Sequence, residues 1–281
     1  MASTVKSPPI VTGRLPVVRF RSLLRSDLVH GVTTRTAELP LNGNMSFMVG
    51  DAPDEVRINR HAWADAIGYQ ADRLVLGRQI HETSVVPVDE SHAGSGADSV
   101  ETSIRRVDGL MTDTPELPIG VMAADCVPIL MYDPVVGAIA AVHAGWRGSI
   151  DGIAARAVES MREQYGSDPG DLQVCLGPSI CSSCYQVGEE VVDRWRGGPY
   201  RRLADPVSVT SEGLYFDLRA ANRGLLTGSG VPDSSIEISD ICTKCSNGSM
   251  FSRRGLGART GLFTSVIMLQ RDQGGKQGSR Q

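Results

Sequence analysis

The chain has 281 residues, a hydrophobic share of 41% and a formal net charge of -4 at pH 7. This length can bury a full core, and the charge argues against a general nucleic-acid binder. The sequence has no apolar run near the roughly 20 residues of a membrane span and no apolar signal core at its N-terminus. We therefore expect a cytoplasmic protein with no membrane partner.

The N-terminal part predicts few regular elements. Residues 1–15 are polar and contain proline, so we expect a loose segment ahead of one domain at residues 16–270. Residues 17–20 are predicted to begin the first strand, and residues 30–35 to form a surface strand. Residues 54–67 have the apolar spacing of a helix, and a glycine follows them as a stop.

The next part alternates short apolar runs with polar linkers. Residues 74–76 and 85–88 are apolar and flank the linker that holds His81. Residues 91–99 are rich in Gly, Ser and Ala and predict a mobile loop. Residues 108–113 are expected to turn the chain back toward the sheet.

The central stretch of the chain holds two apolar runs separated by an Asp-Pro dipeptide, which favours a turn. Residues 127–132 and 136–142 are therefore predicted to form a hairpin. Cys126 stands just before the first strand and His143 just after the second. The hairpin brings a thiol and an imidazole, both able to bind metals, to the same edge of a sheet.

Beyond the hairpin, Ser149 is a good N-cap for an amphipathic helix that runs to Tyr165. Further strands and helices are predicted at residues 172–176, 189–196, 218–226, 236–238 and 263–269. Residues 271–281 are rich in Gly and Gln and are expected to be a disordered tail. These elements predict an α+β fold, a single domain of mixed sheets flanked by helices, with a metal site at the sheet edge.

Six motifs occur in order along residues 30–261, namely RQIH, DGLMTD, ADCVPILMYDP, AVHAGWRG, GPSICSSCYQVGEEV and DICTKCSNGSMFSRR. This ordered set resembles the YfiH-like laccase-domain family, also described as purine nucleoside phosphorylase and as peptidoglycan editing factor. The resemblance implies about one zinc ion per chain, bound by His81, Cys126 and His143. A thiolate and two neutral imidazoles suit zinc, and three protein ligands leave its fourth position open.

The activity that the resemblance implies is zinc-dependent phosphorolysis of adenosine, inosine and methylthioadenosine, with adenosine deamination beside it. Asp125 is a candidate for proton transfer, and a role in fixing its own loop is equally well supported. The planar guanidinium group of arginine can bind two oxygens of a phosphate at once and fix its orientation. We assign Arg78 and Arg147 to catalysis. The residues assigned to substrate or phosphate are Arg35, Gln79, Arg253 and Arg254.

Copper oxidation is disfavoured because multicopper sites need on the order of ten histidines. The chain has five, namely His30, His61, His81, His92 and His143, and we expect His61 and His92 to be exposed. Copper is then at most an adventitious occupant of the zinc site.

Six cysteines in a chain of this kind predict thiols or metal ligands rather than a disulfide framework. Two C-x-x-C pairs, Cys181/Cys184 and Cys242/Cys245, allow a four-thiolate zinc site. The gap between the pairs is far longer than in a zinc ribbon, so we expect thiols without metal. Cys175 lies in an apolar strand and is interpreted as core.

A cell-wall editing factor or hydrolase and a nucleoside-sensing binding protein remain alternative functions, because no residue type separates them from a phosphorylase.

Overall fold

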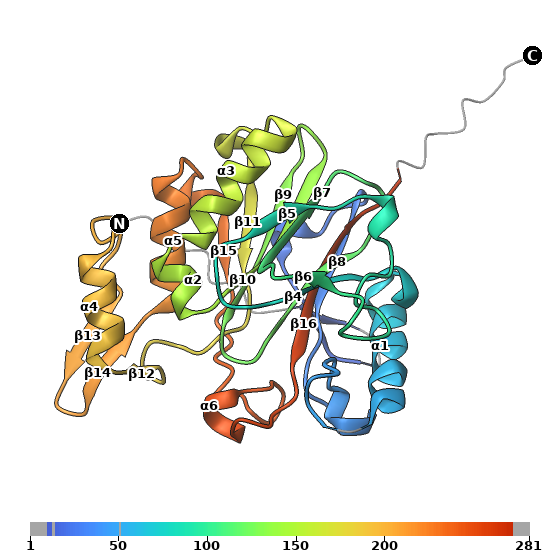
Figure 1. Ribbon diagram of the computed structural model, residues 1–281, viewed down its shortest axis with the longest axis horizontal. Helices are drawn as coiled ribbons and strands as arrows, with labels where there is room; N and C mark the ends of the chain where they lie inside the picture. Colours follow the sequence, from blue (N-terminus) through green and yellow to red (C-terminus); the bar gives the residue numbers. More distant parts are fainter. Residues whose placement is uncertain (1–9, 13–14, 51, 272–281) are drawn as a thin grey trace, which may run out of the picture.

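A computed structural model describes residues 10–12, 15–50 and 52–271 of the chain. Two β-sheets stack against each other, and helices cover the outer face of each (Figure 1). The predicted single α+β domain of mixed sheets flanked by helices is confirmed. Within the described ranges no helix combines the length and apolarity that crossing a membrane requires.

The first sheet has seven strands in the order β1-β2-β3-β16-β8-β4-β6. These strands are β1 (Ile10–Thr12), β2 (Val17–Arg19), β3 (Leu28–Val32), β4 (Val75–Arg78), β6 (Ile104–Arg105), β8 (Ile119–Ala123) and β16 (Phe263–Leu269). β16, from the end of the chain, inserts between β3 and β8 and is antiparallel to both. The N- and C-terminal parts of the domain are therefore joined in one sheet.

The structure corrects two expectations for the first sheet. Part of the segment expected to be loose forms β1, which pairs with β2; residues 1–9 and 13–14 lie outside the described residues. β3 is a fully buried inner strand rather than a surface strand, because β2 and β16 pair on either side of it. The tail predicted to be disordered also lies outside the described residues, apart from Arg271.

The second sheet has six strands in the order β15-β11-β9-β10-β7-β5. These strands are β5 (Val85–Pro87), β7 (Gly109–Thr112), β9 (Val127–Asp133), β10 (Ala138–Ala144), β11 (Gln173–Leu176) and β15 (Ile236–Ile238). The predicted hairpin is at its centre, with β9 antiparallel to β10 and His143 opposite Pro128. The segment at residues 108–113, expected to be a turn, instead supplies β7, which pairs with β10.

Helices cover the two outer faces of the paired sheets. α1 (Pro53–Ile67) packs on the first sheet, and α2 (Trp146–Ile150), α3 (Ile153–Tyr165) and α5 (Leu218–Gly228) pack on the second (Figure 1). A small third sheet of β12 (Gln186–Val187), β13 (Val207–Thr210) and β14 (Gly213–Phe216) lies beside α4 (Glu189–Gly197). The last helix is α6 (Arg253–Leu256).

The helix expected to begin at Ser149 is divided in two. α2 already begins at Trp146, and the chain breaks at Gly152, whose φ of 88° lies in the left-handed region that favours glycine. Ser149 is buried inside α2, and its hydroxyl accepts a hydrogen bond of 2.8 Å from the Asn222 side-chain amide. It therefore joins α2 to α5 instead of capping a helix.

The central hairpin is apolar on both faces because each face meets a different core. On β9, Ile129 and Met131 contribute to the core beneath the helices. The alternate residues Leu130 and Tyr132 contribute to the core between the two sheets. Continuous apolar runs are typical of strands buried on both sides. Each large side chain buried in this way stabilises the fold by about 1.5–3 kcal/mol.

Burial of His30 in the first sheet should make the stability of the fold depend on pH. Its side chain is fully buried, and its Nε2 accepts the Phe20 N–H at 2.8 Å. Burial, and then the charge of Arg19, lower the pKa of His30 from 6.5 to about 3. Between these values the unfolded chain binds more protons than the native chain. The stability that neutral His30 contributes is therefore lost as the pH falls from 6.5 toward 3, at up to about 1.4 kcal/mol per pH unit.

We predict that His30→Gln, whose amide oxygen can accept the same N–H, flattens the dependence of unfolding free energy on pH between 4.5 and 6.5. Denaturant unfolding with chelator present, compared with wild type, measures the slope. The exposed His61 offers a matched control, His61→Gln, which should leave the slope unchanged. Equal slopes in the wild type and the His30 variant would contradict the assignment.

Candidate functional site

His81, Cys126 and His143 lie together where the chain crosses between the two sheets. Each can offer one ligand atom, and these atoms lie within 4.8 Å of one another. His81 is in the segment that leads from β4 of the first sheet to β5 of the second. Cys126 is in the crossing from β8 to β9, and His143 is in β10. Residues far apart in the sequence meet because two crossings end at the same place.

A buried carboxylate, Asp108, holds both histidines. Its Oδ1 accepts the His81 N–H at 2.9 Å and lies 2.9 Å from His143 Nδ1. Its Oδ2 accepts the N–H groups of Ile80 and Glu82, both at 3.0 Å. Bonding of Nδ1 to Asp108 leaves Nε2 of His143 free for a metal, and metal-binding histidines are commonly oriented by a carboxylate in this way.

Asp108 also explains an unusual backbone conformation. His81 has a φ of 64°, in the left-handed region that residues other than glycine rarely adopt. The three successive N–H groups of this turn all donate to the Asp108 carboxylate. Asp108 is absent from the residues predicted from sequence, although it opens the DGLMTD motif. An aspartate placed directly before a buried strand was the available signal.

Gly145 makes room for the cluster. A Cβ atom at this position would lie 2.9 Å from His81 Cδ2 and 3.3 Å from the Cys126 sulfur. The first of these distances is shorter than side-chain packing allows, so a larger residue would displace the ring of His81. The glycine of the AVHAGWRG motif is therefore required by close approach.

The charges of the cluster support a thiolate. Burial raises the pKa of Cys126, but the charge and hydrogen bonds of His143 and His81 outweigh burial and lower this pKa to about 6. Burial lowers the pKa of His143, whereas Cys126 and Asp108 outweigh it and raise this pKa to about 9. A thiolate is the form of cysteine that binds metals or acts as a nucleophile. One thiolate and two imidazoles fit a zinc ion with an open fourth position.

The cluster opens into a cavity of about 300 Å³, at the lower end of the range for small-molecule sites. His81 is exposed toward it, whereas His143 is buried. The apolar part of the wall comprises Phe47, Met48, Val49, Leu76, Val100, Met122, Ala123, Ala124, Ala258 and Leu262. Charged groups stand at the same cavity, so it combines an apolar surface with sites for an anion.

The structure places the predicted arginines in two groups. Arg78 and Arg253 are exposed and line the cavity. The other three are not among the residues that line it: Arg35 donates to the Gly248 carbonyl at 3.2 Å, Arg254 to the Gln186 carbonyl at 2.9 Å, and Arg147 lies over the Trp146 ring. Of the predicted arginines, Arg78 and Arg253 are the two that line the cavity beside the candidate metal cluster.

Gln79 lines the cavity, but its side chain is already engaged. Its amide donates to the Met122 carbonyl and accepts the Met122 N–H, both at 2.8 Å. These two bonds tie β8 to the segment in which Gln79 and His81 lie. This pairing favours a positioning role over direct contact with a substrate.

Asp125 is nearly buried, and three donors hold its carboxylate. Its Oδ1 accepts the hydroxyls of Thr243 at 2.6 Å and Ser252 at 2.7 Å, and its Oδ2 accepts the Arg254 N–H at 2.6 Å. It is not among the residues that line the cavity. Of the two roles considered from sequence, this geometry favours fixing the loop that carries Cys126 over proton transfer.

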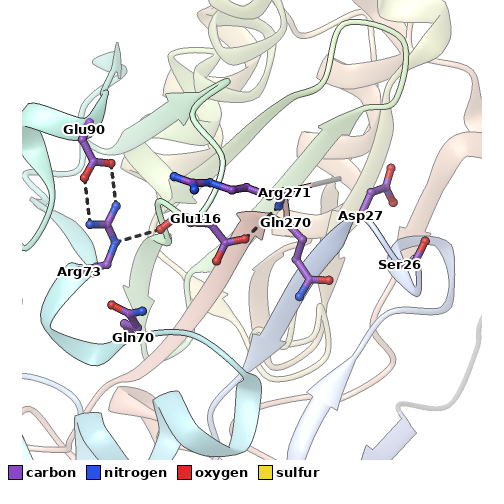
Figure 2. A pocket seen from close by; sticks show the side chains of 8 residues that line it. All are labelled: Ser26, Asp27, Gln70, Arg73, Glu90, Glu116, Gln270 and Arg271. Carbon is purple, nitrogen blue, oxygen red and sulfur yellow. Dashed lines mark hydrogen bonds and ion pairs between the residues drawn. The ribbon is translucent and has the colours of Figure 1, made fainter. Parts of the chain in front are cut away.

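A larger hollow of about 870 Å³ lies at a different place on the molecule, and its lining is polar. Figure 2 shows that several of its charged groups are already paired, with Arg73 bound to both oxygens of Glu90. Arg73 also donates to the Glu116 carbonyl at 3.1 Å. Neither the histidines nor the cysteines described above line this hollow, so it is not the candidate site.

The paired cysteines differ from the sequence interpretation. Cys181, Cys184, Cys242 and Cys245 present their sulfur atoms within 4.8 Å of one another. The long gap between the pairs had argued against such a meeting. β11 and β15 are parallel neighbours, so the loops that follow them leave the same edge of the sheet. Cys175 is fully buried, as predicted.

The family model described as multi-copper polyphenol oxidoreductase laccase matches residues 29–270. The chain belongs to this family. The resemblance to the YfiH-like laccase-domain family is thereby confirmed. The chain is 38% identical over 225 residues to "Adenosine deaminase RL5" from an unknown prokaryotic organism, a match that covers 79% of this chain and 86% of the relative. It is 32% identical over 251 residues to "Purine nucleoside phosphorylase" of Bacteroides thetaiotaomicron, covering 88% and 93%.

Solved structures agree with the fold. The crystal structure of the hypothetical protein YfiH of Bacillus licheniformis is 33% identical, with a TM-score of 0.85 over 94% of this chain and 97% of that chain. YlmD from Geobacillus stearothermophilus also has a TM-score of 0.85, at 32% identity, over 94% of this chain and all of that one. The whole laccase-domain architecture is thus shared.

The copper chemistry in the family description does not match the donors of this chain. Of its five histidines, His81 and His143 meet at a candidate metal cluster in the described residues. The exposed His61 lies on α1, His92 pairs with Asp89, and His30 is in the buried strand β3. A blue-copper site together with a histidine-rich copper cluster cannot be assembled from this set.

We predict that Asp108→Asn lowers the zinc affinity of the cluster about 10- to 100-fold, as loss of a partner that orients a ligand does. The variant keeps the shape of the side chain but removes its charge, so stability should also fall by about 3–5 kcal/mol. Chelator competition and denaturant unfolding measure the two effects. Asp113→Asn, at an exposed position of the same motif, is the control. Wild-type zinc affinity in Asp108→Asn would count against the orienting role.

Proposed function

We propose that this protein is a zinc-dependent purine nucleoside phosphorylase that also deaminates adenosine, and that it works in the cytoplasm. The observation that supports this is the His81, Cys126 and His143 cluster opening onto a cavity with an apolar wall and two exposed arginines, Arg78 and Arg253. Relatives named purine nucleoside phosphorylase and adenosine deaminase support the same choice. Purine nucleosides and phosphate are then its partners.

In this proposal the three residues of the cluster hold the zinc ion. Cys126 binds as a thiolate, and its lowered pKa means that little proton release is needed at neutral pH. Asp108 binds Nδ1 of the His143 ring, so Nε2 would be the atom that holds the metal. When bound, zinc supplies a Lewis acid with one open position. Copper, which binds such donors more strongly, is an adventitious occupant.

The cavity wall assigns places to the two substrates. The purine ring lies against apolar side chains such as Phe47, Met122 and Leu262. Arg78 and Arg253 hold phosphate, because a guanidinium binds two of its oxygens and fixes their direction. A phosphate oxygen then forms a bond to the sugar carbon C1′ while the C1′–N9 bond breaks. The base leaves with the electron pair, and ribose 1-phosphate is formed.

Deamination requires water instead of phosphate at the same cavity. Water replaces the amino group of adenosine, so inosine and ammonia are formed. The described residues that line the cavity include no aspartate or glutamate. The side chains contribute mainly by placing the purine ring, and neither reaction is assigned a carboxylate base from this set.

We predict that purified protein converts inosine and adenosine to free base and ribose 1-phosphate only when phosphate is present. Without phosphate, adenosine should give inosine alone. Chromatography of the bases and an assay of ribose 1-phosphate separate these products. Arg78→Gln should raise the KM for phosphate more than it changes deamination, whereas Arg35→Gln, away from the cavity, should change neither. Absence of any product would favour a cell-wall factor or a nucleoside sensor.

A second prediction separates loss of metal from loss of fold. Cys126→Ser replaces a thiolate by a hydroxyl that stays protonated near pH 7, so one equivalent of zinc and all nucleoside activity should be lost together. The loss of zinc affinity should exceed the roughly 10- to 100-fold loss expected when only a residue that orients a ligand is removed. Tm should fall only by the contribution of that metal. If the variant keeps this zinc yet loses activity, Cys126 acts as a nucleophile and the reaction is of another class.

A further inference from the structure

Four cysteines from two distant C-x-x-C pairs form a second candidate metal cluster. Cys181 and Cys184 lie in the loop after β11, and Cys242 and Cys245 lie in the loop after β15. Their sulfur atoms lie within 4.8 Å of one another, and those of Cys184 and Cys245 are 3.4 Å apart. The sulfur edges of a tetrahedral zinc site with Zn–S bonds of about 2.3 Å are about 3.8 Å long. The four sulfurs are thus already close to the required arrangement.

Backbone groups are arranged to support charge on these sulfurs. The Cys242 sulfur accepts the Cys181 N–H at 3.3 Å and the Cys245 N–H at 3.5 Å. The first bond joins the two loops, and the second closes one C-x-x-C turn. A parallel bridge between Ser179 and Cys242 aligns the loops just before the cluster. N–H groups that point at sulfur stabilise a thiolate more than a thiol.

A half-buried cation lies beside the same loops. The Arg219 guanidinium, from α5, donates to the Ser179 hydroxyl at 2.8 Å, the Ser179 carbonyl at 2.6 Å and the Ser239 carbonyl at 2.7 Å. Four thiolates around a divalent ion carry a net charge of -2. Arg219 offsets part of that charge and holds the loops that present the sulfurs.

We propose that Cys181, Cys184, Cys242 and Cys245 bind a second zinc ion as a closed structural site. Four sulfur donors in a tetrahedron are typical of structural zinc, and no position is left for substrate. This site is separate from the His81, Cys126 and His143 cluster, shares no residue with it and does not depend on the proposed function.

The second site lies one residue away from contacts that position the first. Thr243, next to Cys242, donates its hydroxyl to Asp125. Ile180, next to Cys181, donates its N–H to the Asp125 carbonyl at 3.0 Å. Both loops therefore grip the segment that leads into Cys126. A metal that ties the loops together would stiffen this segment, and its loss would loosen it.

Elemental analysis of the full chain, purified with reductant and without chelator, tests the stoichiometry. We expect two zinc ions per chain in the wild type and one in Cys184→Ser/Cys245→Ser, which changes the two residues of the closest sulfur pair. Cys175→Ala, a buried cysteine outside both clusters, should keep two. A zinc content that is the same in the wild type and in the double variant would overturn the proposal.

Cys126→Ser makes the test independent of whether the double variant folds. The Cys126→Ser variant should keep one zinc ion, and X-ray absorption should show about four sulfur neighbours near 2.3 Å from it. Replacing that ion with Co²⁺ should give intense sulfur-to-metal charge-transfer bands. Nitrogen or oxygen neighbours, no retained metal, or a Cys184–Cys245 disulfide in the protein as purified would each overturn the assignment. A wild-type protein that holds this zinc but shows no nucleoside activity would instead overturn the proposed function alone.

Discussion

The geometry of the candidate metal cluster depends on the buried carboxylate of Asp108. Burying a lone carboxylate costs several kcal/mol, and this cost is offset by four donors: three successive N–H groups and the His143 ring. Hydrogen bonds to a charged group contribute about 1.5–3 kcal/mol each, so the set as a whole favours the ionised form. Because the same carboxylate bonds the backbone of His81 and the side chain of His143, one side chain determines how the two rings meet.

The stacked sheets explain why a metal cluster can form at this place. β4 and β8 belong to the first sheet, and the segments that follow them cross to β5 and β9 of the second. Both crossings lie at the same end of the stack, and each carries a candidate ligand. Backbone in a crossing is free of sheet pairing, so it can adopt the left-handed conformation of His81 and of Asp125. The strands supply a rigid base, and the crossings supply the unusual geometry.

The sequence predicted the parts of the fold that depend on local pattern. The Asp-Pro hairpin, α1 with its glycine stop and α5 follow from periodicity and turn chemistry, and the hairpin alone brought Cys126 toward His143. The roles of Asp108 and of the four cysteines depend on which strands become neighbours, which local pattern does not encode. The grouping of β11 with β15 is such a case, because α4, α5 and a third sheet lie between them in the chain.

The two aspartates near the candidate ligands, Asp108 and Asp125, both bind donor groups of the protein itself. In each of them both carboxylate oxygens accept hydrogen bonds from the protein, and neither residue is among those that line the cavity. Their oxygens bind backbone N–H groups, the His143 ring and the hydroxyls of Thr243 and Ser252. If the proposed function holds, the nucleophile is determined by what binds in the cavity, because the described lining residues include no carboxylate that would select it. Under the proposed function, the exposed Arg78 and Arg253 favour phosphate as the nucleophile, and water needs no dedicated binding group. A single site that uses both nucleophiles is therefore consistent with relatives that carry two different activity names.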